Sequence, residues 1–429
     1  MKKRFFSGLL WLLFVSVGAA QQEQILKSLE DLLASAKSEQ IETGKKRAGL
    51  PSSTWVSSPG SPGAFLHLVY EVSTELPTTS FERPEFLVDA GQRALREGTT
   101  QFVWECREAI PSFRSQRSLL DAMIGGELTQ YDPEAARKWM LEVNQRANAF
   151  PVRDVEKVQA ELAIGFAKLG DFSWGEQAIA GMREEYALYR AGCWMALERV
   201  RQGEWDTEFP DYSLSENRPY MPERSLRAQA LLEAVEWALE QEENAEALRE
   251  RIPVWLDDAL KTIQSHKGSH PEILAKGSLV ALYAQEALGE VAVDAEAWLS
   301  TYRELIPTLS SHNEVTYLSA ITWLKVMEKI GHSVEVRRQA VERLESASRV
   351  LGREKADRVK GLLAIAYAKL GDEEKRDALL QEALVLLQQI SNERTVKIGL
   401  IQLCVDIDNF MIELPEDFLQ QVRAFSESL

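Results

Sequence analysis

Histidine and cysteine are scarce in this sequence of 429 residues, with five and three copies respectively. The cysteines, Cys106, Cys193 and Cys404, match no zinc-binding or redox spacing. Each stands beside apolar residues in a helical pattern, so we expect three buried thiols that act as small apolar side chains. One disulfide with one free thiol is the alternative in an oxidising compartment.

Catalytic motifs are also missing from the sequence. It contains no glycine-rich phosphate loop, no nucleophile elbow and no His-Glu-x-x-His pattern. His266 and His270 have the spacing of a helical metal pair, but Gly268 between them indicates a loop and no third ligand is near. Asp257 and Asp258 fall in an amphipathic helical pattern and are expected to be solvated. We therefore predict no catalytic residue, no metal site and no cofactor.

Basic residues are outnumbered, with 49 Lys and Arg against 66 Asp and Glu and a net charge of −17. A surface of this sign repels nucleic acid and anionic lipid headgroups. The remaining partner classes are proteins, peptides, cations and neutral glycans. The acidity does not choose among them, because it also aids solubility.

Long apolar runs are absent as well. The uncharged stretch Phe5–Val17 has 13 residues, whereas a membrane span needs about 20. Basic residues precede it at Lys2–Arg4, and small residues follow it at Gly18–Ala20. This order predicts a secretory signal peptide over residues 1–20, cleaved before Gln21, and a bacterial protein that is periplasmic or secreted. An uncleaved anchor is the alternative, and a lipoprotein is disfavoured because no cysteine lies near the cleavage site.

The rest of the sequence alternates about sixteen segments of helical periodicity with short breaks. Residues 23–38 form an amphipathic helical pattern, and a Pro/Ser/Gly-rich stretch runs from residue 50 to 63. We therefore expect residues 21–63 to form a helix and linker, and residues 64–429 to form the helical body. No run of alternating β-branched residues with hairpin turns occurs, so the predicted fold class is all-α.

Helix boundaries are marked by local signals. Asp132-Pro133-Glu134 combines a capping residue, a proline for the first turn and an acid. Prolines stand at similar predicted starts at Pro151, Pro253 and Pro271. Glycine, which readily takes the left-handed conformation at a helix end, closes segments at Gly170, Gly203, Gly289, Gly331, Gly352 and Gly371.

An internal repeat is the strongest pattern in the sequence. The segment Leu162–Asp171 reads LAIGFAKLGD, and Leu363–Asp372 reads LAIAYAKLGD, with eight of ten positions identical at an offset of 201 residues. Weaker copies end at Gly203, Gly289 and Gly331. A period near 33–48 residues built of two helices is typical of a helical solenoid.

At these residues the chain resembles the tetratricopeptide repeat (TPR) family. That family places Leu, a small residue, an aromatic and Gly at positions that correspond here to Leu162, Ala163, Phe166 and Gly170, and again to Leu363, Ala364, Tyr367 and Gly371. The family's alanine five residues after the glycine is replaced by Gly175 and Arg376, and the period wanders from 34. The resemblance implies αα-hairpins stacked into a TPR-like right-handed solenoid. It also implies protein or peptide binding in a concave groove, although no contact residue carries over.

One irregular segment, residues 205–222, interrupts the helical pattern. It holds the aromatic residues Trp205, Phe209, Tyr212 and Tyr220. It also holds the acids Asp206, Glu208, Asp211 and Glu216. Long structureless loops in compact domains are often functional, so these aromatics are candidate binding residues. An insertion pinned by its aromatics to the edge of the repeat array is the competing interpretation.

Tryptophans stand inside predicted helices at Trp139, Trp194, Trp237, Trp298 and Trp323. We expect them to pack in the core or between repeats. The favoured function is then an exported, non-enzymatic scaffold that binds a protein or peptide. The alternative is a glycan hydrolase or lyase on a closed α/α toroid, which would use carboxylates of residues 205–222.

Overall fold

The computed structural model describes residues 63–97, 99–210, 223–241, 245–265, 270–289, 292–305, 314–349, 353–410, 412, 414 and 416–429. The predicted signal peptide, the 23–38 helix and nearly all of the 50–63 linker lie outside these residues. Gly63 is the first residue of the first described helix.

Every regular element in the described ranges is a helix, which confirms the all-α class. The helices are α2 (Gly63–Glu75), α3 (Glu82–Glu97), α4 (Thr100–Ala109), α5 (Ser115–Leu128), α6 (Pro133–Ala147), α7 (Val152–Lys168), α8 (Phe172–Ile179), α9 (Glu185–Arg201), α10 (Glu223–Leu239), α11 (Ala245–Gln264), α12 (Pro271–Leu288), α13 (Ala295–Leu305), α14 (Glu314–Lys329), α15 (Val334–Ser348), α16 (Arg353–Lys369), α17 (Glu373–Gln388), α18 (Glu393–Asn409) and α19 (Glu416–Ser428). None of these helices is long and apolar enough to cross a bilayer.

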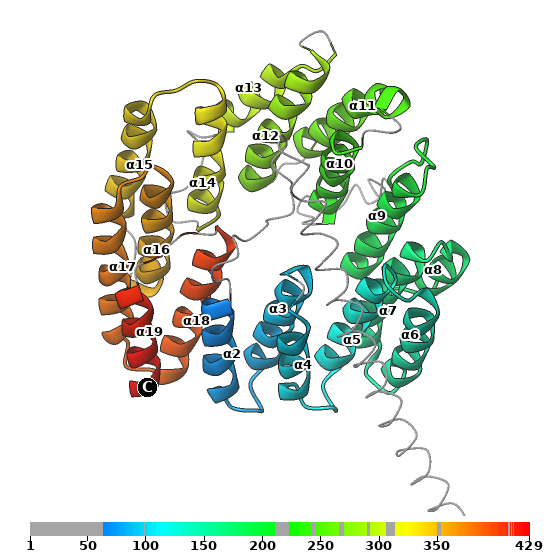
Figure 1. Cartoon of the computed structure of the whole chain (residues 1–429), viewed down its shortest axis with the longest axis horizontal. Coiled ribbons are helices and arrows are strands. Elements are labelled where there is room, and N and C mark those ends of the chain that lie inside the picture. The colour runs from blue at the N-terminus through cyan, green and yellow to red at the C-terminus, as the bar shows by residue number, and fades with distance from the viewer. Residues whose placement is uncertain are drawn as a thin grey trace, which may run out of the picture.

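The helices follow one another around a ring in chain order (Figure 1). The helices α3, α5, α7, α9, α10, α12, α14, α16 and α18 pack successively side by side, and most are followed by a partner helix that packs against them. Between α9 and α10 no such partner helix is described, and these two helices pack directly together. The irregular segment predicted at residues 205–222 falls at this junction.

The two ends of the helical array meet, because α2 packs against both α18 and α3. Arg93 Nη1 lies 2.7 Å from Asp408 Oδ2, and Arg394 Nη2 lies 2.5 Å from Glu82 Oε1. The apolar side chains of α2 and α18 belong to one continuous core. The described helices therefore form a closed ring.

Local signals fix most helix ends as the sequence predicts. The Asp132 carboxylate accepts a hydrogen bond from the backbone N–H of Ala135, with Pro133 in the first turn. Five of the predicted terminal glycines have positive φ angles: Gly170, Gly203, Gly289, Gly331 and Gly371. The sixth, Gly352, lies outside the described residues.

The predicted helix start at Pro253 is wrong, because this residue lies inside α11. Leu248 and Ile252 precede the proline, are each 1% exposed, and continue the apolar stripe formed by Leu256. Burial of this stripe outweighs the cost of the missing N–H at Pro253. Pro151 and Pro271 do stand at helix starts, before α7 and at the first position of α12.

The sequence repeat extends into the helix boundaries. Adding 201 to the bounds of α6 gives those of α15, and adding 201 to those of α7 gives those of α16. The Arg137–Asp171 ion pair recurs at the same offset as Arg338–Asp372. Each aspartate also caps the helix that follows it, by accepting a backbone N–H from the residue three positions on. We call α5–α8 the first copy and α14–α17 the second copy.

The three cysteines are free and buried, as expected. Each is at most 1% exposed. Burial raises the pKa of Cys106 and of Cys193 to about 12. The alternative of one disulfide is therefore not realised in this structure.

Candidate functional site

The aromatics predicted for binding in residues 205–222 are only partly described. Phe209 is 4% exposed and lies in the core shared by α9–α12, and Trp205 packs against the same core. Tyr212 and Tyr220 lie outside the described residues. The structure thus places the two described candidates, Trp205 and Phe209, against the core.

A cavity of about 500 Å³ lies beside Trp205 and the first turns of α11. Asp206, one of the predicted acids, is paired there with Arg251. The Trp205 indole nitrogen is buried and has no hydrogen-bond partner among the described residues. The carboxylate of Asp206 is thus an exposed ion-pair partner on the rim of a small, open cavity.

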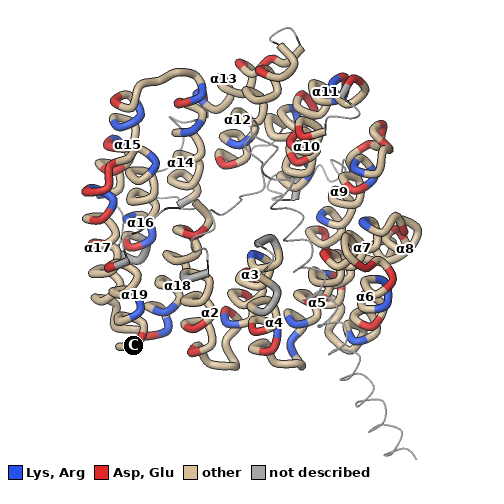
Figure 2. The backbone as a smooth tube through the Cα atoms, in the orientation of Figure 1, with Lys and Arg blue, Asp and Glu red and all other residues tan. Residues whose placement is uncertain are grey.

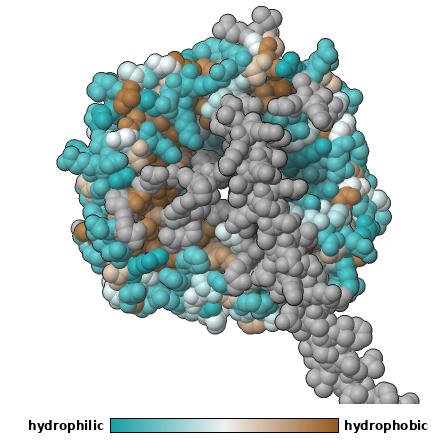
Figure 3. Space-filling view, viewed as in Figure 1, coloured by the Kyte–Doolittle hydropathy of each residue, from teal (hydrophilic) through white to brown (hydrophobic). Residues whose placement is uncertain are grey.

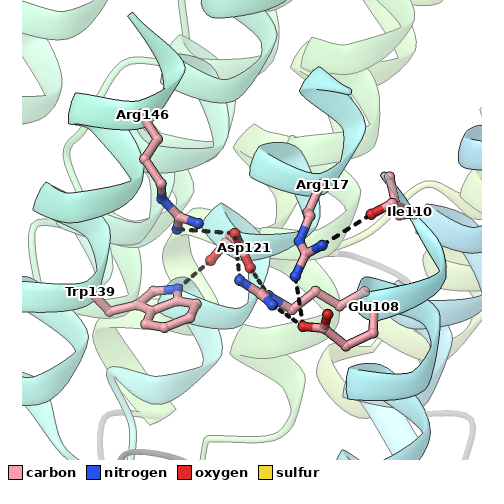
Figure 4. A network of polar contacts seen from close by, with 7 residues as sticks. Glu108, Ile110, Arg117, Asp121, Trp139 and Arg146 are labelled. Atoms are coloured by element: carbon pink, nitrogen blue, oxygen red, sulfur yellow. Dashed lines mark hydrogen bonds and ion pairs between the residues drawn. The ribbon is translucent and has the colours of Figure 1, made fainter. Parts of the chain in front are cut away.

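A buried polar network joins α4, α5 and α6 (Figure 4). The Asp121 carboxylate, fully buried, accepts a hydrogen bond from Arg107 Nε at 2.5 Å and pairs with Arg146 Nη2 at 3.0 Å. Trp139 Nε1 donates to the backbone carbonyl of Asp121 at 2.8 Å. Both guanidinium groups also lie over the Trp139 ring. Because these groups satisfy one another, the network ties three helices together and offers little to a ligand.

The main candidate site is a groove of about 1160 Å³ on the inner side of the ring. Its walls come from five successive inner helices, α3, α5, α7, α9 and α10, and Lys276 of α12 closes one end. We call this surface the inner groove. Figure 2 shows that acidic and basic residues are interspersed around the ring, so no large part of it carries charges of one sign only.

Glycines shape one wall of the inner groove. A Cβ atom added to Gly165 of α7 would lie 2.5 Å from Met140 Sδ and 3.4 Å from the Cα atom of Gly126 in α5. Only residues without side chains allow the two helices to approach this closely. No side chain therefore projects into the groove from Gly126 of α5 or Gly165 of α7, and the longer side chains around them form its sides.

Most charged side chains of the inner groove are paired with one another. Lys168 Nζ lies 2.7 Å from Glu127 Oε1, which links α7 to α5. The other three pairs are Arg190 with Glu161, Arg201 with Glu198, and Lys276 with Glu236. Three of the four pairs connect neighbouring helices, so the charges are held in place before any ligand arrives.

Three carboxylates lie along one face of α10, at Glu233, Glu236 and Glu240. Burial raises the pKa of Glu236, and the neighbouring carboxylates Glu233 and Glu240 raise it further. The Lys276 ammonium opposes this shift. The pKa of Glu236 is therefore held above the usual range of a glutamate, mainly by burial.

Two tryptophans line the inner groove, Trp194 of α9 and Trp237 of α10. The Arg190 guanidinium carbon lies 5.1 Å from the centroid of the Trp194 ring. Both tryptophans are half-buried, whereas Trp139 and Trp298 are in the core as expected.

The expected core role is incomplete for Trp194 and Trp237, because helical periodicity alone does not tell which face looks inward. Their charged neighbours were an available signal. Arg190 and Glu198 lie one turn before and after Trp194, and Glu233 and Glu240 flank Trp237 in the same way.

No group of three or more possible metal ligands occurs among the residues that the structure describes. His270 precedes α12 with its Nδ1 atom 3.6 Å from Glu272, and His266 lies outside the described residues. Asp257 pairs with Lys261 at 2.5 Å, and Asp258 pairs with Arg227 at 2.7 Å.

The residues above are the basis for interpreting the site, because comparison of the chain with protein-family models, curated proteins and solved structures finds no significant match.

Proposed function

We propose that the protein is an exported, non-enzymatic, TPR-like scaffold that binds an extended protein or peptide segment in the inner groove. The observation that carries this proposal is the combination of pre-paired charges and half-buried tryptophans along five consecutive helices. The TPR resemblance of the repeated block supports the same class of partner.

The size and chemistry of the inner groove suit a peptide. Its volume of about 1160 Å³ is above the range of about 300–1,000 Å³ typical of small-molecule pockets. Trp194 and Trp237 offer broad faces for apolar side chains, and aromatic anchors dominate many peptide interfaces. The ordered carboxylates and ammonium groups can then contact the backbone and polar side chains of an extended segment without first paying for their own ordering.

Selection of peptides on the mature protein, followed by affinity measurements, tests this proposal. Replacing Trp237 by Ala is expected to weaken binding of a selected peptide by about tenfold or more, because truncating an interface tryptophan costs about 2 kcal/mol. Phe113→Ala is the control, since Phe113 is 70% exposed in the turn before α5 and is not part of the groove. Selection that yields no specific peptide, or equal affinities for both variants, contradicts the proposal.

A glycan-active enzyme is the second candidate, because the ring is closed and Glu236 has a raised pKa. A carboxyl with a raised pKa is the kind of group that acts as a general acid toward a glycosidic oxygen. This version uses the α10 carboxylates in place of those of residues 205–222. It predicts release of reducing ends from a polysaccharide by the natural protein and loss of that activity in Glu236→Gln. A polysaccharide panel that yields no release refutes it.

Export is a part of the proposal that can be tested separately. If the signal peptide is cleaved after Ala20, the intact mass of protein from the periplasm or medium must correspond to a chain that begins at Gln21. A chain retained in the membrane with residues 1–20 attached would contradict this and support the uncleaved anchor.

A further inference from the structure

The two ends of the inner groove differ in chemistry. At α3 and α5 the lining includes four apolar side chains, Val88, Leu95, Leu119 and Met123, beside two acids, Asp89 and Glu127. At α9 and α10 it consists of the two tryptophans and mostly charged side chains, among them four carboxylates: Glu198, Glu233, Glu236 and Glu240. A segment lying along the groove therefore meets apolar surface at one end, and aromatic rings with acids at the other.

The α9–α10 end remains acidic after its internal ion pairs are counted. Eight acidic and five basic residues line the whole groove, and three of the acids lie on α10. Burial raises the pKa of Glu236, and Glu233 and Glu240 raise it further, although Lys276 Nζ lies 3.0 Å from Glu236 Oε2. Figure 3 shows a mainly hydrophilic surface on the side of the ring that holds α7–α9, in contrast to the apolar side chains gathered over α14–α17.

The groove already holds one cation against an indole ring. The Arg190 guanidinium carbon lies 5.1 Å from the centroid of the Trp194 ring, and the same guanidinium pairs with the Glu161 carboxylate. An aromatic face together with a carboxylate is a favourable setting for a guanidinium or ammonium group.

Trp237 has the same kind of neighbours without the cation. Glu233 lies one turn before it and Glu240 one turn after it on the same face of α10, and all three line the groove. Among the described residues, no Lys or Arg lies over the Trp237 ring as Arg190 lies over Trp194. The Trp237 face therefore offers a ring and two acids to a cation that comes from outside the chain.

We propose, building on the peptide-binding function proposed above, that the inner groove selects segments with a basic side chain at one end and an apolar side chain at the other. The guanidinium or ammonium group lies over Trp237 beside Glu233 and Glu240. The apolar side chain packs against Leu119 and Met123 at the α3–α5 end.

The separation of the two ends sets the spacing of the two side chains. Neighbouring helices pack with their axes about 8–10 Å apart. The helices α5 and α10 are separated by α7 and α9, so the two ends lie roughly 25 Å apart. An extended chain covers about 3.3 Å per residue, which places the basic and apolar residues about seven or eight positions apart.

Fluorescence anisotropy of the mature protein with labelled synthetic peptides tests this selectivity. One probe has two leucines followed by about six Gly and Ser residues and two arginines, and a second probe has the reverse order, so that both chain directions are sampled. Matched probes carry citrulline, which keeps the shape of arginine without its charge. We expect citrulline to weaken binding by about tenfold, because the cation–aromatic and ionic contacts are lost.

Variants of the protein locate the effect. Glu233→Gln is expected to weaken binding of the arginine probe by about fivefold to tenfold and to leave binding of the citrulline probe unchanged. Glu240→Gln, the second variant, is expected to act in the same direction. Glu296→Gln is the matched control, because it removes the same charge from an exposed pair with Arg303 outside the groove. It is expected to change neither affinity.

Three outcomes would overturn the selectivity: no binding by either arginine probe, equal affinities for arginine and citrulline probes, or equal losses in Glu233→Gln and Glu296→Gln. Peptide selection on the mature protein decides the proposed function separately. Selected peptides that lack a basic residue but lose affinity in Trp237→Ala would refute only this selectivity and leave the groove as a peptide site.

Discussion

At the scale of single residues, Asp171 and Asp372 each perform two tasks. Each accepts a backbone N–H at the start of a helix and also pairs with an arginine two helices back, Arg137 of α6 or Arg338 of α15. The hydrogen bond from Arg338 lowers the pKa of Asp372, with further help from the Lys375 backbone N–H. The pattern of Gly followed by Asp therefore fixes both the end of one helix and the placement of the next.

Replacing Asp372 by Asn separates the two tasks, because Asn still caps the helix but carries no charge. A carboxyl with a lowered pKa stabilises the fold above its unfolded pKa and loses this contribution as pH falls through its folded pKa. We therefore expect Asp372→Asn to be less stable than the natural protein at pH 7, with the difference disappearing as the pH falls through the lowered pKa of Asp372. Urea unfolding at a series of pH values measures this. A difference that stays constant with pH would show that the charge plays no part.

Gly371 has a φ angle of 75° at the end of α16. A β-branched side chain is strained in this region, so Gly371→Val is expected to lower the free energy of unfolding by about 1–2 kcal/mol. Gly181→Val is the matched control, because a Cβ atom there meets no atom within 4 Å and its φ is not positive. Chemical denaturation compares the two, and equal losses would contradict the stated cause.

At the scale of helices, the sequence predicts what is decided locally. Helix ends depend on capping aspartates, terminal glycines and apolar periodicity, which all act within a turn or two. A few residues are therefore enough to predict the end of α7 near Gly170 and the start of α6 at Pro133. Pro253 was misassigned because tertiary burial of the α11 stripe overrides a local breaker. Trp194 and Trp237 are predicted to pack in the core or between repeats, because periodicity identifies an apolar face without saying what covers it, and the structure leaves both half-buried in the groove wall.

Close packing between helices is most demanding at Gly277 of α12. A Cβ atom there would overlap the ring of Trp298, which is 2% exposed and cannot move away. Gly277→Ala is therefore expected to destabilise the protein by about 1–3 kcal/mol through overpacking, despite the better helix propensity of alanine. Thermal unfolding measured beside Gly181→Ala checks this. An unchanged or higher melting temperature would mean that α12 and α13 can move apart.

At the scale of the whole molecule, the feature that the sequence could not reveal is the closure of the ring. A repeat length of 33–48 residues does not predict whether the stacked helices close into a ring, because closure depends on small rotations accumulated over many helices. The charges that meet at the junction are more than 300 residues apart in the chain. The inner groove has the same origin, since its lining residues come from five helices that only the curvature brings together.

The closing contacts give the ring a measurable weak point. Arg93 is nearly buried and donates to Asp408, Asn409 and the Val405 carbonyl. Arg93→Ala leaves the Asp408 carboxyl buried without its cation, so we expect a loss of about 3 kcal/mol in stability. Solution scattering is expected to show a larger radius of gyration as the ring opens. Arg394→Ala removes an exposed pair with Glu82 and is expected to cost less than about 1 kcal/mol. Equal effects of the two variants would contradict this ranking.

Closure also has a consequence for how the chain is made. The apolar face of α2 packs on α18, which follows it by more than 300 residues. During synthesis from the N-terminus, this face has no native partner until nearly the whole chain has been produced. A contact between residues so far apart in the chain forms late in folding, and apolar surface stays exposed until it has formed. The apolar face of α2 therefore stays exposed, and open to chaperone binding, for most of the time that synthesis takes. A chain truncated just before α18 would keep this face exposed permanently.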